Sequence, residues 1–454
     1  MKKNKYEIDM CNGTIMDKLI SFSIPLMLSG ILQLMFNAVD IVVVGRFSGS
    51  QALAAVGSTT ALINVFTNLF IGISLGANVL AARYYAAGKT KEMSETVHTA
   101  IALALVSGVA MAVIGVVFAR GALEIMGTPD DVIAKSTLYM RIYFCGMPFF
   151  MMYNYGAAIL RAVGDTKRPL IFLIVSGVIN AVLNLFLVIG FHLDVAGVGI
   201  ATVISQLVSC ILVLRCLHHT ESSYQLHLAK LRIRSVYLKQ IFEVGVPAGI
   251  QSTVINISNA MLQSSVNSFG SIAMAGYTAS NNIFGFLYVS VNSFTQACMS
   301  FTSQNYGVKK LKRMDRVLID CMILSVVVTL ILGSSVYVFG PELLHIYSDQ
   351  ADVIQYGMEI FSYTTVTYFL CGLMDLFPGA LRGMGYSTVP MILSIIGTVG
   401  VRIIWIYGLF PSHRSLAFLF LSYPVSWIAT IIMQVICFWF VREKIHRTMA
   451  VTAE

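Results

Sequence analysis

The sequence predicts an all-α membrane protein whose twelve transmembrane helices form two pseudo-symmetric six-helix lobes. Three observations lead to this prediction: the composition, a regular succession of long apolar segments, and a repeat between the two halves of the chain. Of the 454 residues, 57% are apolar and only 11% are charged, and the mean hydropathy is +0.78. A soluble protein carries about twice that share of charged residues, so most of this surface is expected to face lipid.

Twelve apolar segments are each long enough to cross a bilayer as a helix, which takes about 20 residues. Helix is the expected form, because these segments are longer than barrel strands and lipid offers no water to unpaired backbone groups. The predicted spans are 19–44, 52–81, 97–119, 136–160, 169–190, 197–217, 241–267, 274–301, 317–339, 353–381, 389–410 and 415–441.

The basic residues that flank these spans are distributed unequally. Most lie on the side of the two termini, whereas the loops of the opposite side carry only Arg46, Arg120, Lys135 and Arg414. Basic residues stay on the cytoplasmic side of a membrane protein. We therefore expect a multi-pass protein of the cell membrane with both termini in the cytoplasm. The same distribution accounts for the net charge of +8 without a nucleic-acid partner.

The second half of the chain repeats the first at a shift of 221 residues. ILRAVG at 159–164 matches ALRGMG at 380–385, and Pro169 matches Pro390. Parallel repeats of this kind are typical of secondary transporters. The predicted parts are an N-terminal cytoplasmic tail (1–18), an N-lobe (19–217), a hydrophilic cytoplasmic linker (218–240), a C-lobe (241–441) and a C-terminal cytoplasmic tail (442–454).

An ordered set of short motifs resembles the multidrug and toxic compound extrusion (MATE) family of transporters. The motifs are PLMLSGILQLMFNAVD at 25–40, VGRFSGSQALAAVG at 44–57, ARYYAAGK at 82–89, LRAVGDTKRP at 160–169 and LRGMGYSTVP at 381–390. The resemblance implies two six-helix lobes around a V-shaped cavity, with export driven by the entry of protons or sodium ions. We expect a monomer that transports small molecules among membrane lipids, with no cofactor besides the coupling ion.

Asp40 is the first ionisable residue that the predicted spans place inside the membrane. It lies 22 residues after Lys18, and a rise of about 1.5 Å per residue puts it in the outer half of the first span. Gln33, Asn37 and Asp40 share one helix face. Because a charge in the membrane is costly, Asp40 is a functional candidate that can hold a proton or help to bind a hard cation. Alternatively, it caps or pairs locally near the outer surface.

The resemblance adds three residues to Asp40. Asn180 and Asn184 of the fifth span and Thr202 of the sixth occupy positions of the family's cation site. Many relatives have aspartate in place of Asn184, so this chain offers one carboxylate instead of two. Fewer negative charges weaken a Na⁺ site more than a proton site, and this favours proton coupling over Na⁺ bound by these four residues. Asn and Thr also join membrane helices without binding any ion, and that alternative stays open.

The second half has no counterpart of Asp40, because Leu262 occupies the matching position. Its seventh span carries a neutral polar stripe instead, and we expect polar residues of both halves to support the interior cavity: Gln33, Asn37, Asn154, Asn256, Asn259 and Gln263. Asp375 and Arg402 are predicted to pair within the C-lobe, since two separate charges there would cost more than one ion pair. The pair is either a static bridge or one that opens when Asp375 is protonated.

These observations favour an antiporter that exports amphipathic, cationic small molecules. A flippase for lipid-linked sugars is the alternative, but it would need a more basic cavity than Arg141 and Arg402 provide. A membrane-embedded enzyme is disfavoured, because no paired catalytic groups are seen. The sequence contains no nucleotide-binding P-loop, so this chain by itself does not use ATP.

Overall fold

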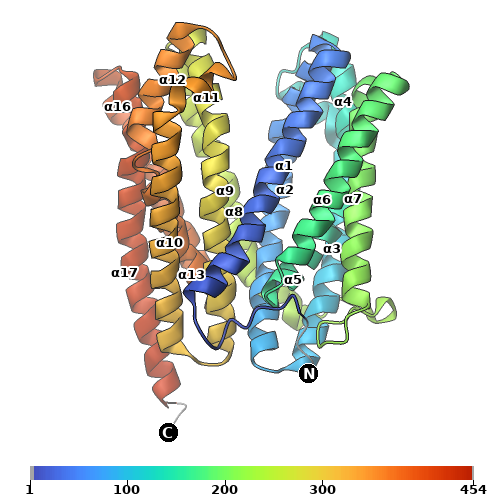
Figure 1. The fold of residues 1–454 in the computed structure, drawn as a ribbon, viewed down its shortest axis with the longest axis vertical. Helices are drawn as coiled ribbons and strands as arrows, with labels where there is room; N and C mark the ends of the chain where they lie inside the picture. Colours follow the sequence, from blue (N-terminus) through green and yellow to red (C-terminus); the bar gives the residue numbers. More distant parts are fainter. Residues whose placement is uncertain (1–4, 452–454) are drawn as a thin grey trace. The chain divides into compact units, whose positions relative to one another are not determined.

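The computed structural model describes residues 5–451, so the ends of the two predicted tails, 1–4 and 452–454, lie outside the described residues. The described chain consists of helices and connecting loops (Figure 1). The first half contains α1 (Met16–Phe47), α2 (Ser50–Ala86), α3 (Thr90–Ile125), α4 (Asp130–Cys145), α5 (Met147–Ala162), α6 (Lys167–Leu185), the π-helical turn η1 (Phe186–Gly190) and α7 (Asp194–His218).

The second half follows a short 3₁₀ turn, η2 (Leu228–Lys230), and repeats this order with more interruptions. It contains α8 (Ser235–Asn267), α9 (Ser271–Gly307), α10 (Leu311–Val338), α11 (Gly340–His345), α12 (Ala351–Thr364), α13 (Tyr368–Gly383), α14 (Thr388–Ser394), the π-helical η3 (Ile395–Gly400), α15 (Val401–Ile404), the π-helical η4 (Trp405–Leu409), the 3₁₀ turn η5 (Phe410–Ser412), α16 (Leu416–Phe420) and α17 (Ser422–Val451).

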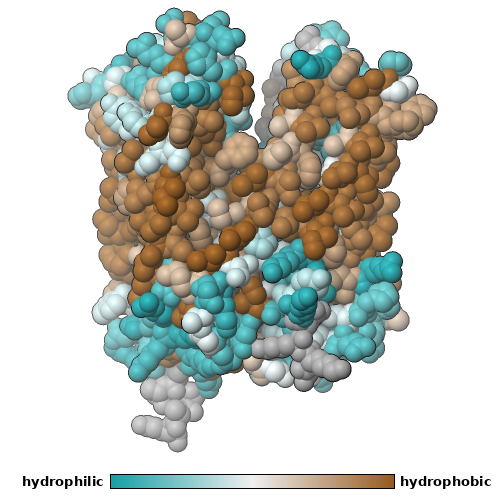
Figure 2. All heavy atoms as spheres, in the orientation of Figure 1, coloured by the Kyte–Doolittle hydropathy of each residue, from teal (hydrophilic) through white to brown (hydrophobic). Residues whose placement is uncertain are grey.

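Each of the twelve predicted spans falls on a helical segment of the described chain. Eight segments are long and apolar enough to cross a membrane by themselves, and α12 with α13, bent by 51°, make a ninth. The other three predicted spans fall on α4 with α5, on α8 and on α9. Helix α8 carries Asn256, Asn259 and Gln263 on one face, which lowers its hydropathy. In both units, defined below, Figure 2 shows a hydrophobic band between hydrophilic ends.

The chain divides into two compact units. Unit 1 comprises Met1–Ile8 and Leu28–Val246, and unit 2 comprises Asp9–Met27 and Pro247–Glu454. Helices α1 and α8 therefore each pass from one unit to the other, close to Pro25 and Pro247, which lie inside the helices. A proline removes one backbone hydrogen bond and weakens a helix locally. The division differs from the predicted lobes at two places. Residues 19–27 were predicted for the N-lobe and belong to unit 2, and residues 241–246 were predicted for the C-lobe and belong to unit 1.

The connection between the halves is packed onto unit 1, although its sequence predicts a hydrophilic linker. Tyr224 and Leu226 are fully buried, and the N–H of Leu226 donates to the carbonyl of Leu217 at 3.0 Å. The Tyr224 hydroxyl donates to Oε1 of Glu7 at 2.7 Å. Burial raises the pKa of Tyr224 to about 12, so this phenol keeps its proton and remains a donor. Two apolar anchors thus fix a connection whose remaining residues are mostly polar.

Close helix contacts in unit 1 depend on glycine. A Cβ on Gly108 of α3 would lie 2.5 Å from the Cα of Pro148 at the start of α5. A Cβ on Gly177 of α6 would lie 1.8 Å from Cζ of Phe36 in α1. Contacts this short exclude any side chain larger than hydrogen unless a neighbour moves. The second contact brings α1 against α6 where the predicted cation-coupling residues lie.

Candidate functional site

The four predicted cation-coupling residues form one hydrogen-bonded chain inside unit 1. The side-chain amide of Asn184 donates to Oδ1 of Asp40 and, at 3.2 Å, to Oδ1 of Asn180. Nδ2 of Asn180 in turn donates to Oγ1 of Thr202 at 3.5 Å. The Thr202 hydroxyl donates to the carbonyl of Val198 in its own helix at 2.9 Å. The structure thus brings together residues from α1, α6 and α7, while their role in coupling stays a prediction.

The local sequence explains why these side chains meet. Asn180 and Asn184 are one turn apart on α6, so they share a face. Gly177 lies one turn before Asn180 and admits the ring of Phe36. Phe36 is itself one turn before Asp40 on α1. The ring of Phe36 therefore packs on α6 next to the place where Asp40 accepts from Asn184.

The centre of this chain is shielded from water. Asn184 is fully buried and Asn180 is 5% exposed, whereas Asp40 and Thr202 are half-buried. Oδ1 of Asn184 is buried and has no hydrogen-bond partner among the described residues. Leaving a buried acceptor unpaired costs about 1–3 kcal/mol. An acceptor left open beside a carboxylate is suited to a proton-carrying group or a cation.

Asp40 has no basic partner within the described chain. It forms no ion pair with a described Lys, Arg or His side chain, and it lies in the interior of α1 and not at a cap. The groups around it include the phenols of Tyr139 and Tyr143 on α4, on which its charge acts. The alternative prediction of a local cap or ion pair near the outer surface is therefore wrong. Within residues 5–451, its carboxyl group accepts a hydrogen bond from the amide of Asn184.

The predicted supporting residues take different positions. Gln33 and Asn37 of α1 are exposed in unit 1. Asn154 is half-buried and donates to the carbonyl of Phe150 in its own helix at 2.8 Å. In unit 2, Asn256 and Gln263 of α8 are exposed, while Asn259 is half-buried between them. A role for these residues in a cavity stays a prediction.

The predicted pair of Asp375 and Arg402 is wrong. Nη1 of Arg402 donates to Oδ1 of Asn259 at 2.8 Å, and its Nε donates to Oγ of Ser426 at 3.4 Å. Its guanidinium carbon lies 4.5 Å from the centre of the Tyr423 ring. Arg402 follows the π-helical turn η3, which changes the direction of later side chains relative to an uninterrupted α-helix. The prediction of pairing assumed regular α-helical geometry.

Asp375 has other partners, which the sequence did not reveal. It lies near Tyr288 of α9 and within the electrostatic reach of Arg382 on α13. Arg382 is only 8% exposed, and its Nη2 donates to Oε1 of Gln251 at 2.6 Å. From sequence, Arg382 counts as a basic loop residue of the cytoplasmic side. Helix α13 instead continues through Arg382 to Gly383, and the Arg382 side chain is buried within unit 2.

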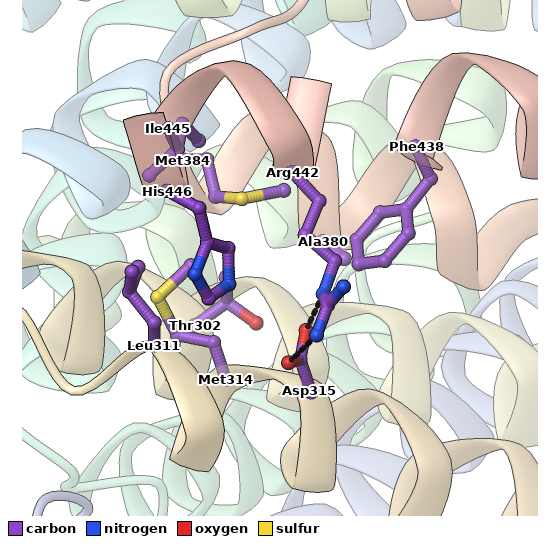
Figure 3. A pocket seen from close by; sticks show the side chains of 10 residues that line it. All are labelled: Thr302, Leu311, Met314, Asp315, Ala380, Met384, Phe438, Arg442, Ile445 and His446. Carbon is purple, nitrogen blue, oxygen red and sulfur yellow. Dashed lines mark hydrogen bonds and ion pairs between the residues drawn. The ribbon is translucent and has the colours of Figure 1, made fainter. Parts of the chain in front are cut away.

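A small cavity lies in unit 2 between the beginning of α10 and the end of α17 (Figure 3). Its volume of about 10 Å³ is room for roughly one water molecule. Its walls are mostly apolar, and Arg442 pairs with Asp315 at one side through contacts of 2.8 and 2.7 Å. Drug-sized ligands need about 300 Å³ or more. We therefore assign this cavity to packing and not to substrate binding.

Comparisons with known proteins agree over the whole chain. A protein-family model described as MatE matches residues 25–186 and again 247–407, which confirms the predicted repeat. The probable multidrug resistance protein YoeA of Bacillus subtilis (strain 168) is 30% identical over 389 residues, covering 84% of each chain. The multidrug export protein MepA of Staphylococcus saprophyticus subsp. saprophyticus is 23% identical over 405 residues, covering 88% of each chain.

Solved structures show the same fold. The outward-facing conformation of a multidrug resistance MATE family transporter of the MOP superfamily superposes with a TM-score of 0.88 at 20% identity, covering 98% of this chain and 99% of that one. This likeness confirms the predicted all-helical membrane fold of twelve spans in two six-helix lobes.

Proposed function

Because this chain belongs to the MATE family of multidrug efflux transporters, we propose that it exports amphipathic small molecules in exchange for protons that bind at Asp40. It is a transporter and not an enzyme. The observation that carries the proposal is the hydrogen-bonded chain from Asp40 through Asn184 and Asn180 to Thr202. A carboxyl group with no basic partner can take up a proton without breaking an ion pair.

The orientation of the Asn184 amide supports a proton over a sodium ion. Its N–H group, not its oxygen, faces Asp40 and Asn180. A hard cation needs several oxygens directed at one point. Sodium would require this amide to turn over, and the site would still supply a single carboxylate. Sodium bound by Asp40, Asn180, Asn184 and Thr202 is the alternative coupling ion.

Location and substrate follow from the sequence and the family. The excess of basic residues on one side supports a cell-membrane protein with both termini in the cytoplasm. The names of the two relatives refer to multidrug resistance and export, which supports amphipathic small molecules, including cationic ones, as substrates. We also propose that the protein is a monomer.

Transport by reconstituted vesicles tests this proposal. Purified protein would be placed in liposomes, and ethidium movement would be followed by fluorescence under an imposed pH gradient or an imposed sodium gradient, each without the other. We expect the pH gradient to drive transport and the sodium gradient to have little effect. We expect Asp40→Asn to lower the gradient-driven rate by at least about tenfold, the factor that 1.4 kcal/mol gives.

Asp130→Asn is the matched control, because Asp130 is an exposed aspartate at the start of α4. It should transport like the unchanged protein. Size-exclusion profiles of all variants in detergent would show that they are folded. Transport that ignores both gradients, or an Asp40→Asn variant as active as the control, would refute proton antiport at Asp40.

A further inference from the structure

Arg402 is a buried cation of unit 2 whose described partners are all neutral. It is 3% exposed. It donates to the side chains of Asn259 and Ser426 and lies over the ring of Tyr423. Among residues 5–451, no carboxylate forms an ion pair with Arg402, and its two side-chain hydrogen bonds use Nε and Nη1 and leave Nη2 out. The guanidinium group thus retains donors that no described side chain uses.

Such an arrangement is costly unless an anion completes it. Arginine keeps its proton in proteins, so burial does not neutralise it. A buried charge without an opposite charge destabilises a membrane protein, and such residues usually serve a function. The planar fork of donors matches the two oxygens of a carboxylate or phosphate. The open donors of Arg402 therefore indicate a ligand with an anionic oxygen group.

The nearest candidate within the chain is engaged elsewhere. Asp375 lies near Tyr288, and Arg382 supplies the positive charge that acts on it. The groups whose charges act on Arg402 are Tyr423, Cys371 and Tyr277, and none of these is a carboxylate. Within the described part of unit 2, Asp375 thus has an arginine nearby, whereas Arg402 has no acidic partner.

The backbone around Arg402 is built in an unusual way. The single α-helical turn α15 lies between the π-helical turns η3 and η4. π-helical turns are rare and occur frequently at functional sites. In the first half, η1 begins two residues after Asn184, next to the chain that reaches Asp40. Each half thus places a π-helical turn beside its buried polar group.

The surroundings of Arg402 suit an amphipathic ligand. The Tyr423 ring packs against the rings of Phe420 and Trp427, at centroid distances of 6.4 and 5.5 Å. On α8, the exposed Asn256 and Gln263 lie one turn to either side of Asn259 on the same face. This stripe leads from an exposed surface of unit 2 to the amide that contacts Arg402. Of these rings Phe420 and Trp427 are buried and Tyr423 is half-buried, so an aromatic or apolar body would pack on Tyr423 while an anionic group meets the guanidinium.

We propose that Arg402, with Asn259, binds the carboxylate of amphipathic substrates, so that zwitterionic and anionic molecules are transported besides cationic ones. This inference rests on the proposed function, because it names a substrate class of the same exporter. Arg402 acts as a specificity-determining residue and takes no part in proton coupling at Asp40. The phosphate of an anionic lipid shares this chemistry, and the experiment separates the two sources.

Equilibrium binding of a matched dye pair tests the proposal. Rhodamine B carries a free carboxylate, and its ethyl ester lacks that charge and adds one ethyl group. Binding to the purified protein in neutral detergent would be measured by fluorescence anisotropy, with protein-free micelles as the blank. We expect the acid to bind about tenfold more tightly than the ester, as one charge-assisted hydrogen bond provides. Equal binding of the two dyes, or binding of neither, would overturn the proposal.

Three variants identify the residue responsible. Arg402→Gln keeps an amide that can donate to Asn259 but removes the charge, and it should abolish the preference for the acid while leaving the ester bound as before. Arg402→Lys should keep part of the preference. Arg414→Gln, at an exposed position of unit 2, should keep all of it. Loss of both dyes in Arg402→Gln, or a preference unchanged by it, contradicts the assignment.

Two further arms keep other failures apart. Asp40→Asn should retain the preference for the acid, because no gradient is involved, so failure of proton antiport leaves this result unaffected. Phosphatidylglycerol added to the detergent tests the lipid alternative. If the lipid binds with a dependence on Arg402 while the protein shows no preference between acid and ester, the site belongs to lipid and the substrate proposal is overturned.

Discussion

At the scale of single residues, the two halves differ in the partners of their ionisable side chains. Asp40 is surrounded by amide and phenol groups and has no basic partner among the described residues. Asp375 lies near Arg382, and Arg402 is bound by neutral groups alone. A carboxyl group without a counter-ion can take up a proton without losing an ion pair, whereas protonation beside an arginine gives up a favourable charge interaction. This difference supports our proposal that protons exchange at Asp40 in unit 1.

We propose that Asn184 decides which ion Asp40 can bind, and its substitution tests this. Asn184→Asp would add a second carboxylate beside Asp40 in the buried part of the chain. Two carboxylates share either a proton or a cation, because their charges repel. We expect sodium-driven ethidium transport in vesicles to rise by at least about tenfold, the factor for 1.4 kcal/mol.

The control for this substitution is Asn154→Asp. Asn154 is a half-buried asparagine of unit 1 that bonds within its own helix. It should leave the response to sodium unchanged. An Asn184→Asp variant that transports under a pH gradient but still ignores sodium would show that the number of carboxylates does not set the choice of ion.

At the scale of helices, the positions of the long apolar helices were predictable from the sequence, whereas their π-helical turns were not. Each predicted span falls on a helical segment because hydropathy reports burial in lipid directly. The π-helical turns η1, η3 and η4 leave no mark in the hydropathy, and they change which side chains face each other. The continuation of α13 through Arg382 was likewise hidden, since a basic residue next to a turn resembles a loop residue.

The contact between α1 and α6 depends on the absence of a side chain at Gly177. Gly177→Ala would bring a Cβ to 1.8 Å from Cζ of Phe36, and overpacking of this kind costs about 1–3 kcal/mol. We expect the variant to unfold at a lower temperature in detergent, measured by intrinsic fluorescence, and to transport more slowly. Phe36→Leu in the same protein should restore much of the stability.

Gly57→Ala is the control for helix propensity, because a Cβ there meets nothing within 4 Å. Alanine favours a helix over glycine by about 1 kcal/mol at both positions. The difference between the two variants therefore reports the clash alone. If Gly177→Ala is as stable as Gly57→Ala, the close approach does not position Asp40.

At the scale of the whole molecule, the repeat was accessible from the sequence, and the pairing of buried charges was not. Matching motifs at a constant shift indicate two similar halves, because a duplicated chain folds in the same way twice. Asp40 was predicted from the cost of a charge in the membrane, and Asn180, Asn184 and Thr202 were added by resemblance to a family; the structure then placed the four predicted residues in one chain. The partners of Arg402 and Asp375 lie on helices distant in sequence, so no periodicity connects them.

Release of a proton when substrate binds tests the central claim most directly. Purified protein in weakly buffered detergent would be mixed with ethidium, and a pH indicator would report protons set free at several starting pH values. We predict a release that reaches about one proton per bound ethidium where Asp40 is protonated in the free protein, and that is absent in Asp40→Asn. Binding of ethidium with no proton release, or equal release from Asp40→Asn, would contradict the account.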